Sequence, residues 1–453
     1  PLGENMHTTQ VREFAAAKRR GAKIIVADPR PSVAASKADE WLPIKPGQGG
    51  ALAAAIAHVL LTKGMWSKEF VGDFKEGKNL FVPGQEVDPE TFEEKHTYGI
   101  VRFWNLELKD KTPDWAAERA GLPVEQITRV AMDYGKAGSQ SISWVGGGPV
   151  MQVRGAYASM ICHCLNGITG ACDNVGGTLV NNKEYTVGFP SFEEFMDETA
   201  KKGSKLAKID HRGRKDFPCI TSGRPGSSVV TNRAADGILT ADPYDIKVAI
   251  AYMNNFNFSC TQPERWNQAL AKIPFLVHIT TNASEFSWFS DILLPDTHHL
   301  FEKWGWVKSS ANGYRHVTLQ QPVIKPMWES KIDETEIPWL ISEKLAQRGF
   351  DNMLRYFKTI KDPETGKEPA NEKEFALNCV KLTTQNLWDP AKYQGGDKFN
   401  GWDEFRTAGV WNSAPYPFRH RWSAMNPKTK KFEFYSETLK AALEEHAKKH
   451  NTT

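Results

Sequence analysis

Apolar residues recur at helical spacing in some stretches of the chain and gather into short continuous runs in others. Val11, Phe14 and Ala17 fall on one side of a helix over residues 8–20, and the apolar run at 22–27 suits a strand buried on both faces. The same pattern predicts helices at residues 49–61, 123–134 and 155–172 and a strand at 141–145. Helices and strands that alternate in this way are typical of α/β proteins.

The pattern weakens in the middle of the chain and then returns. Residues 185–243 are rich in Gly, Lys, Arg and Ser and predict long loops. Beyond them the sequence predicts strands at 246–253, 275–281 and 292–294, a helix at 263–271, and irregular or β structure at 303–326. The last hundred residues mix short helices with loops rich in Pro, Gly and Trp, and end in a charged amphipathic helix at 436–449.

Two distant segments share one layout. The first runs from the start of the chain through a helix and a strand to Asp39, with Pro43 four positions later. The second runs from Asn255 through a helix and a strand to Asp291, with Pro295 four positions later. Such a unit, occurring twice, can form two mononucleotide-binding halves whose strand ends and helix N-termini face phosphate. Because β-α-β units resemble one another, coincidence remains an alternative.

The sequence therefore predicts an α/β fold with doubly wound, mostly parallel sheets in two pseudo-symmetric nucleotide-binding halves, interrupted by loop-rich insertions. A length of 453 residues fits two to four folding units. We expect a first dinucleotide-binding unit at 1–150, a central helix with a loop-rich insertion at 151–245, a second dinucleotide-binding unit at 246–330, and a peripheral helical and loop region at 331–453.

Composition and charge exclude some partners. Lys and Arg number 57 against 54 Asp and Glu, and this balance argues against a nucleic acid or an anionic membrane as partner. No stretch approaches the roughly 20 consecutive apolar residues of a membrane span. The sequence begins at Pro1 without a Met or a signal peptide, which we interpret as a truncation. Fifteen Trp and 24 Phe suggest large buried interfaces or a deep cofactor cleft.

Zinc and iron–sulfur sites typically use a C-x-x-C spacing, and none of the six cysteines shows it. The nearest cluster is Cys162-His163-Cys164, and Cys164 falls on the apolar face of the helix predicted there. We interpret these cysteines as buried thiols, since free Cys behaves as a small hydrophobic residue. Metal ligation is the less favoured alternative.

Four groups of motifs point to one known family. They are Asp28-Pro29-Arg30 with Leu42 to Gly47; Gly146 to Gln152 with Leu165 to Gly170; Asn255 with Asp291 and Leu294-Pro295; and Lys431 to Thr438. In this order, and over nearly the whole chain, they resemble the dimethyl sulfoxide reductase family of molybdenum and tungsten enzymes. The sequence departs from the family pattern at Gln48-Gly49, Phe256 and Phe286.

The resemblance implies a bis-molybdopterin guanine dinucleotide cofactor that carries Mo or W. It assigns Asp28, Arg30, Gly47 and Gln48 to one guanosine end, and Asn255, Thr281, Asp291 and Asp296 to the other. It places Gly147 in the central cofactor loop, and Gln152, Arg154 and Asn181 nearer the pterins. Structural roles stay open as alternatives: a turn at Asp28, a strand-end cap at Asp291, and a tight turn at Gly146 to Gly148.

In the family, a cysteine cluster for a [4Fe–4S] centre and the residue that ligates the metal precede the segment that matches this chain. The resemblance therefore places no catalytic residue and no metal ligand within it. His298 and His299, just after a strand end, are candidates for the substrate channel, with a surface role as the alternative. The resemblance also implies an iron–sulfur partner subunit, a membrane anchor subunit in some members, and a periplasmic location.

Residues 12–30 and 165–179 look closest to the branch that reduces thiosulfate, polysulfide, tetrathionate and arsenate. The expected activity is anaerobic respiratory reduction of a sulfur or arsenic oxyanion, or of another small molecule, at molybdenum. A formate dehydrogenase-like enzyme and a non-catalytic scaffold subunit of the same family remain alternatives. A nicotinamide-dependent dehydrogenase is disfavoured because no G-x-G-x-x-G motif is present in the sequence.

Overall fold

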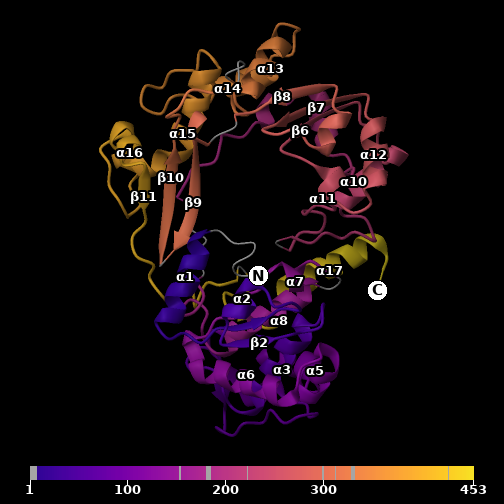
Figure 1. The fold of residues 1–453 in the computed structure, drawn as a ribbon, viewed down its shortest axis with the longest axis vertical. Coiled ribbons are helices and arrows are strands. Elements are labelled where there is room, and N and C mark those ends of the chain that lie inside the picture. Colours follow the sequence, from indigo (N-terminus) through magenta and orange to yellow (C-terminus); the bar gives the residue numbers. More distant parts are fainter. Residues whose placement is uncertain are drawn as a thin grey trace. The chain divides into compact units, whose positions relative to one another are not determined.

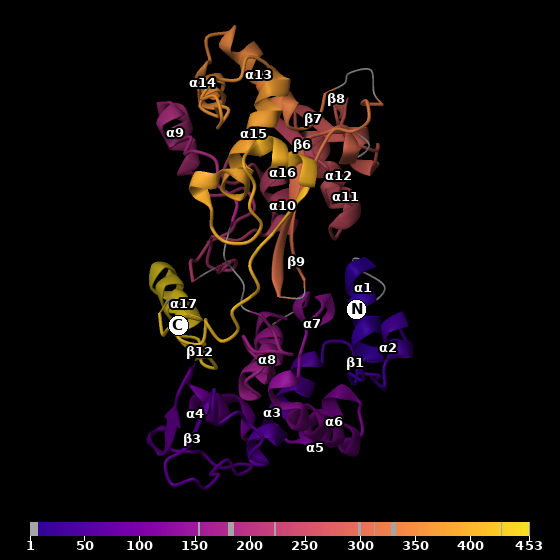
Figure 2. The ribbon, with the colours of Figure 1, turned by 90° about the vertical axis from the view of Figure 1, so that its left-hand side faces the viewer.

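The computed structural model describes residues 8–152, 155–179, 185–221, 223–297, 300–311, 313–327, 332–426 and 428–452 (Figures 1 and 2). The chain forms two compact units. Unit 1 comprises Pro1–Asn181 and Pro417–Glu437, and unit 2 comprises Asn182–Tyr416 and Thr438–Thr453. The four-part division expected from the sequence stays a prediction.

Unit 1 is mainly helical. Its helices are α1 (Thr8–Arg19), α2 (Val33–Lys37), α3 (Gly49–Thr62), α4 (Ile100–Phe103), α5 (Pro113–Ala120), α6 (Val124–Ala137), α7 (Gly147–Val150) and α8 (Gly155–Ile168). Its strands are β1 (Ile25–Ala27), β2 (Glu40–Leu42), β3 (Gly72–Phe74), β4 (Phe92–Glu94), β5 (Thr97–Tyr98) and β12 (Phe432–Glu433). Strands β1 and β2 are parallel, as are β5 and β12, whereas β3 and β4 are antiparallel.

Helix α3 is the centre of unit 1 (Figure 1). All its residues from Leu52 to Leu61 are buried, because α5, α6 and α8 pack around it. Its run of alanines lets these helices approach closely, and its one buried histidine, His58, bonds the carbonyl of Leu108 at 2.8 Å. A helix that is apolar on all sides belongs inside a packed domain.

Unit 2 combines two three-stranded sheets with helices. The strands are β6 (Val248–Tyr252), β7 (Phe275–Thr280), β8 (Ile292–Pro295), β9 (Gly305–Ala311), β10 (Tyr314–Gln320) and β11 (Val410–Asn412). The helices are α9 (Glu198–Ser204), α10 (Thr231–Thr240), α11 (Phe256–Ser259), α12 (Pro263–Lys272), α13 (Glu336–Ala346), α14 (Asn352–Lys358), α15 (Glu372–Trp388), α16 (Trp402–Ala408) and α17 (Glu437–His450), which begins in unit 1.

The two sheets of unit 2 have different topologies. Strands β6, β7 and β8 form a parallel sheet in that order, and β11, β10 and β9 form an antiparallel one. Helices α10, α11 and α12 lie beside the parallel sheet (Figure 1), where Leu270 and Ile273 pack on Leu276. The parallel sheet is the part of unit 2 that can offer strand ends to a nucleotide.

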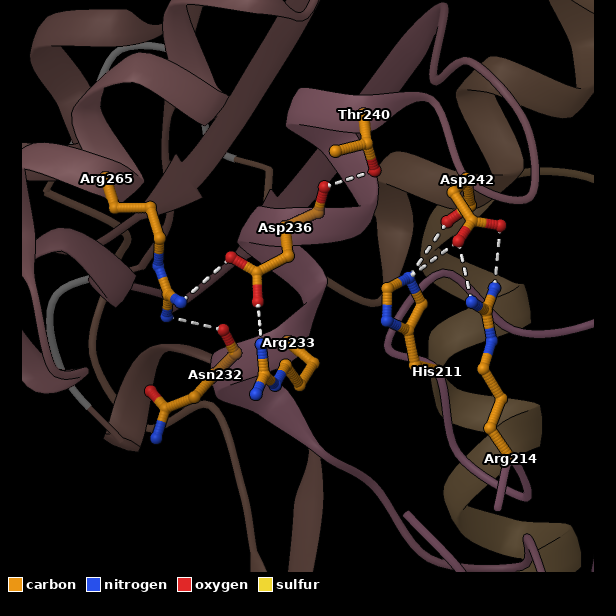
Figure 3. A network of polar contacts seen from close by, with 8 residues as sticks. All are labelled: His211, Arg214, Asn232, Arg233, Asp236, Thr240, Asp242 and Arg265. Atoms are coloured by element: carbon orange, nitrogen blue, oxygen red, sulfur yellow. Dashed lines mark hydrogen bonds and ion pairs between the residues drawn. The ribbon is translucent and has the colours of Figure 1, made fainter. Parts of the chain in front are cut away.

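Arginine–carboxylate pairs fix α10 against α12 (Figure 3). Arg265 on α12 donates to Asp236 Oδ1 at 2.9 Å and to the carbonyl of Asn232 at 2.7 Å. Arg233 binds the other oxygen of Asp236 at 2.7 Å. One carboxylate held by two guanidinium groups thus positions the helices beside the parallel sheet, through charge-assisted hydrogen bonds.

Most predicted helices and strands are confirmed, but the doubly wound sheet is not. The fold is mixed α/β, and its sheets in the described part of the chain have only two or three strands. The predicted strand at 141–145 is absent. The side-chain amide of Asn166 instead pairs with both the N–H and the carbonyl of Ser143, at 2.7 and 2.9 Å, and takes the place of a neighbouring strand.

The sequence predicts long loops at residues 185–243, but the structure has two helices, α9 and α10, in this segment. Asp197 accepts a hydrogen bond from Ala200 N at 2.7 Å and starts α9. Helix α10 also forms there, although it has no side-chain cap. Contacts with α12 stabilise α10, because tertiary packing provides most helix stability in proteins. The local sequence of α10 therefore did not predict the helix.

None of the described helices combines the length and the apolar character needed to cross a membrane.

Candidate nucleotide-binding edges

In unit 1 the carboxyl ends of β1 and β2 lie side by side. Asp28 follows β1, and its N–H donates to the carbonyl of Leu42, the last residue of β2, at 3.2 Å. Its Oδ1 accepts a hydrogen bond from Arg30 N at 3.1 Å, so the turn role that the sequence left open for Asp28 is present. Asp28 is half-buried, and Arg30 is exposed on the segment that leads to α2.

A glycine-rich turn joins β2 to α3. Gly47 has φ +83°, a left-handed conformation that favours glycine, and Gln48 caps α3 without a side-chain hydrogen bond. No acidic residue lies in the first turn of α3. The N–H groups at the start of a helix have no partner within it, so this turn can bind an anion.

Helix α7 and the start of α8 lie directly against this turn. A Cβ atom on Gly47 would lie 2.9 Å from Gln152 Oε1, and one on Gly49 would lie 3.2 Å from Pro149 Cγ. The structure therefore brings Gly47, Gln48 and Gln152 together, with Gly147 at the start of the neighbouring helix. Gly147 begins a single helical turn rather than the tight turn left open by the sequence.

Arg154 and Asn181 lie outside the described residues, so their expected place near the pterins stays a prediction.

The two segments with the shared layout have the same local geometry. Asp39 Oδ2 accepts from Ile24 N at 2.8 Å while Asp39 N donates back to the Ile24 carbonyl at 2.8 Å. Asp291 Oδ2 accepts from Leu276 N at 2.7 Å while Asp291 N donates back to the Leu276 carbonyl at 2.8 Å. In each segment the two bonded residues are 15 positions apart, and they directly precede the first paired residues of two parallel strands.

Both carboxylates act as clamps at the amino ends of their strands. Asp39 precedes β2 and Asp291 precedes β8, whereas nucleotides bind at the carboxyl ends of parallel strands. The strand-end cap that the sequence left open for Asp291 fits this geometry better than contact with guanosine. The guanosine contact of Asp291 stays a prediction.

Asp291→Ala should destabilise unit 2 by about 1–2 kcal/mol, because the N–H of the fully buried Leu276 loses its acceptor. Asp291→Asn, which keeps an oxygen acceptor, should recover most of this loss. Denaturant unfolding of the three proteins measures the difference. Equal destabilisation by both substitutions would contradict the clamp role.

In unit 2, polar residues follow the carboxyl ends of β6 and β7. Asn255 comes after β6; its Nδ2 donates to Glu285 Oε2 at 2.8 Å, and its Oδ1 accepts from Phe286 N at 3.1 Å. Thr281 follows β7 directly. The hydrogen bond from Asn255, and then one from the backbone N–H of Glu285 itself, lower the pKa of the Glu285 carboxyl group. Glu285 is exposed and carries its charge at neutral pH.

A pocket of about 510 Å³ opens beside these residues and is lined by Ala283, Ser284, Glu285, Ser287 and Trp288. Among the described residues of the unit, Trp288 is the most exposed large apolar side chain, with 89% of its surface accessible. An ionised carboxylate and an open indole ring at a parallel strand edge suit a ribose and a flat base.

Asp296 follows β8 but is turned inward. It is fully buried, and its Oδ1 accepts from Thr297 N at 2.7 Å and from Glu334 N at 3.1 Å. Glu334 Oε1 accepts from Lys303 Nζ at 2.5 Å and from Tyr252 Oη at 3.1 Å. The expected guanosine contact of Asp296 is untested, and in this arrangement its carboxyl group serves the interior of unit 2.

The Asp296 and Glu334 carboxyl groups titrate as a pair. Burial, and then the neighbouring Glu334, raise the pKa of Asp296 to about 6. For Glu334 the cost of burial is outweighed by hydrogen bonds from Asp296 and Lys303, which lower its pKa. The pair therefore holds one proton in weakly acidic solution.

This pair predicts a pH dependence. The pKa of Asp296 is higher in the folded protein than in the unfolded chain, so its contribution to stability is complete below about pH 4 and is lost as the pH rises through 6. Glu334→Gln should lower the pKa of Asp296, because the neighbouring negative charge is gone. Infrared titration of the carboxylic C=O band checks this, with the surface variant Glu118→Gln as control. An unchanged titration in Glu334→Gln would rule out the pair.

The remaining candidates are two histidines and two cysteines. His298 and His299 lie outside the described residues, so their substrate role stays a prediction. Cys162 and Cys164 are buried, as the sequence predicts. Burial raises the pKa of Cys162 to about 11 and that of Cys164 still further, which disfavours the thiolate that a metal would need.

Comparison with known proteins identifies the family of the chain. The sequence model of the family described as "Molybdopterin oxidoreductase" matches residues 2–347. The chain belongs to the molybdopterin oxidoreductase family. The resemblance to the dimethyl sulfoxide reductase family, drawn from the motifs, is thereby confirmed.

Two curated relatives of this molybdopterin oxidoreductase share about half of its residues. The arsenate respiratory reductase molybdopterin-containing subunit ArrA of Shewanella sp. (strain ANA-3) is 51% identical over 95% of this chain and 51% of its own length. Its counterpart in Chrysiogenes arsenatis is 50% identical over 100% of this chain and 54% of its own length. The chain thus spans about half the length of these relatives.

Two further matches are more distant. The thiosulfate reductase molybdopterin-containing subunit PhsA of Salmonella typhimurium is 25% identical over 77% of the chain. Among solved structures, acetylene hydratase from Pelobacter acetylenicus aligns with 97% of the chain and 55% of its own length at a TM-score of 0.66 and 18% identity. This likeness supports the mixed α/β fold of the chain.

Sequence reasoning missed part of the second edge of this molybdopterin oxidoreductase. The role of Trp288 could not be predicted from the sequence, because a single exposed Trp belongs to no periodic pattern. The carboxyl pair of Asp296 and Glu334, with Lys303, was also missed, because Glu334 lies 38 residues further along the chain. The hydrogen bond from Asn255 to Glu285 could not be predicted either, because 30 positions separate the two residues.

Proposed function

We propose that this chain is part of the catalytic subunit of a respiratory reductase whose substrate is an arsenic oxyanion, arsenate. One observation carries the proposal: the two arsenate respiratory reductase subunits are 51% and 50% identical to the chain along 95% and 100% of its length. Relatives named for dimethyl sulfoxide or thiosulfate are only 24–27% identical. Twice the identity favours arsenate over the sulfur compounds.

The cofactor of this proposal is bis-molybdopterin guanine dinucleotide with Mo or W. When bound, it supplies two-electron chemistry with transfer of an oxygen atom at the metal. The edge in unit 1 suits a diphosphate, because the first N–H groups of α3 have no partner within the helix and no acidic residue lies in its first turn. Gly47, Gly49 and Gly50 let Gln152, Pro149 and Ala158 pack closely against this turn. Asp28, at the adjoining strand end, suits the ribose hydroxyls.

The edge in unit 2 fits the second guanosine. Asn255 and the backbone hold the Glu285 carboxylate in place, where it can accept hydrogen bonds from ribose hydroxyls. The exposed ring of Trp288 offers a flat surface for the base. Thr281 lies at the adjacent strand end. In this proposal the two edges are the nucleotide-binding sites that the duplicated layout predicts.

The remaining features belong to the protein beyond this chain. The proposal places a [4Fe–4S] cluster and the residue that ligates the metal in parts of the subunit that the relatives possess and this chain does not span. It pairs the subunit with an iron–sulfur electron-transfer subunit, and with a membrane anchor subunit, in the periplasm.

The test is made on the full-length subunit, purified without oxygen. We expect about one Mo or W per protein, about two guanine nucleotides released by acid for each metal, and arsenate-dependent oxidation of a reduced viologen dye. A protein with neither metal nor nucleotide is a scaffold, and the catalytic proposal fails. A loaded enzyme that reduces thiosulfate or dimethyl sulfoxide, but not arsenate, removes the substrate assignment and leaves the cofactor sites standing.

A further inference from the structure

A second cavity lies within unit 2, on residues that the nucleotide edges do not use. Its volume is about 400 Å³, and it lies among α13, α14, α15 and the start of β9. Six aromatic rings line it: Phe189, Trp304, Trp306, Tyr356, Phe357 and Phe375. We call it the aromatic cavity.

The segment around Phe189 is tied across α14 and α15. Val187 N donates to the carbonyl of Thr383 on α15 at 2.7 Å, and Tyr356 Oη on α14 donates to the carbonyl of Pro190 at 2.9 Å. These two hydrogen bonds hold one side of the aromatic cavity in place. The wall is therefore built from several elements fixed to one another.

Three polar side-chain groups of the wall, those of Thr383, Trp306 and Tyr356, already have partners. Thr383 Oγ1 donates to the carbonyl of Cys379 at 2.8 Å and accepts from Trp306 Nε1 at 2.8 Å. The Tyr356 hydroxyl is used by Pro190. None of the described side chains that line the cavity is ionisable as an acid or a base at neutral pH. A ligand here meets hydrocarbon, sulfur and ring surfaces, with few hydrogen bonds on offer.

The Cys379 thiol stays neutral. Burial raises its pKa to about 12, so it faces the cavity as a polarisable S–H group. Sulfur packs favourably against the edges of aromatic rings. A charged ligand would lose its hydration in this cavity without gaining a partner, at a high cost in free energy.

The size of the cavity sets the size of the ligand. The cavity is open to solvent, and the Phe189 side chain on its wall is half exposed. An engineered apolar cavity of about 150 Å³ already binds benzene. A cavity of about 400 Å³ has room for a fused ring system.

We propose that the aromatic cavity is a binding site for an uncharged aromatic molecule of two fused rings. The site is separate from the nucleotide edges and does not depend on the proposed function. Ring stacking and the exclusion of water supply the affinity, and the absence of charge on the wall supplies the selectivity.

The first test compares two probes that differ in charge. We titrate the protein with 1-fluoronaphthalene and follow the ¹⁹F resonance of the probe, and we titrate it with naphthalene-1-sulfonate by competition. We expect saturable binding of the neutral probe, at least tenfold tighter than the anionic one. No saturable binding of the neutral probe, or equal binding of both, overturns the proposal.

The second test fills the cavity. Cys379→Phe should weaken binding of the neutral probe at least tenfold, and Val380→Phe, on the same wall, replaces it if the first variant does not fold by circular dichroism. Asp403→Phe adds the same ring on the surface of α16, where the Asp403 side chain is 90% exposed, and should leave binding unchanged. A folded filled variant that binds like the wild type overturns the proposal.

Discussion

Gln48→Glu is expected to change cofactor binding and stability in opposite directions. A carboxylate at the N-cap of α3 would face the diphosphate that we place at this helix N-terminus. Repulsion between charges a few ångströms apart is on the order of several kcal/mol near a protein surface, so retention of guanine nucleotide should fall about 100-fold. In cofactor-free protein the same charge favours the helix dipole, by about 0.5 kcal/mol.

Nucleotide released per protein and thermal unfolding of the cofactor-free protein measure the two effects. Gln48→Ser is the matched control, because serine caps a helix without adding charge. It should keep the nucleotide and gain a comparable stability. If Gln48→Glu retains as much nucleotide as the wild type, the diphosphate does not lie at the start of α3.

Gly155→Ala is expected to cause the largest loss of stability. A Cβ atom at this position would lie 1.9 Å from the carbonyl oxygen of Val150 and 2.5 Å from its carbonyl carbon. Both are backbone atoms, so no side-chain rotation relieves the clash, and α7 must move away from α8. We expect a loss of roughly 3 kcal/mol, together with displacement of Gln152 from Gly47.

The control is Gly148→Ala in α7, the helical turn that Gly155 packs against. A Cβ atom on Gly148 would meet no atom within 4 Å, so this change should be neutral or slightly stabilising. Denaturant unfolding gives the stability, and nucleotide content gives the effect on the site. Similar stability of the two variants would mean that α7 and α8 are not packed as the structure has them.

The candidate site could be predicted from sequence only in part. Motifs placed Asp28, Gly47 and Gln48 at one strand edge and Asn255 and Thr281 at the other, because a residue that follows a strand lies at its carboxyl end whatever the rest of the fold does. The roles of Asp291 and Asp296 could not be derived in this way. Their carboxylates bind Leu276 N and Glu334 N, 15 and 38 residues away, and only the folded chain brings these groups together.

The sequence alone determined the positions of most helices and strands, the repeated aspartate–proline layout, and the family. These depend on local periodicity and on residues a few positions apart, which the chain order preserves. The tertiary structure decided which distant groups the polar side chains bind and which ring stays exposed. The Asp291 and Asp39 carboxylates clamp Leu276 and Ile24, the buried Asn166 amide replaces a strand, and the Trp288 ring stays open. Burial of a polar group depends on distant partners that satisfy its hydrogen bonds, and spacing along the chain does not encode which segments supply them.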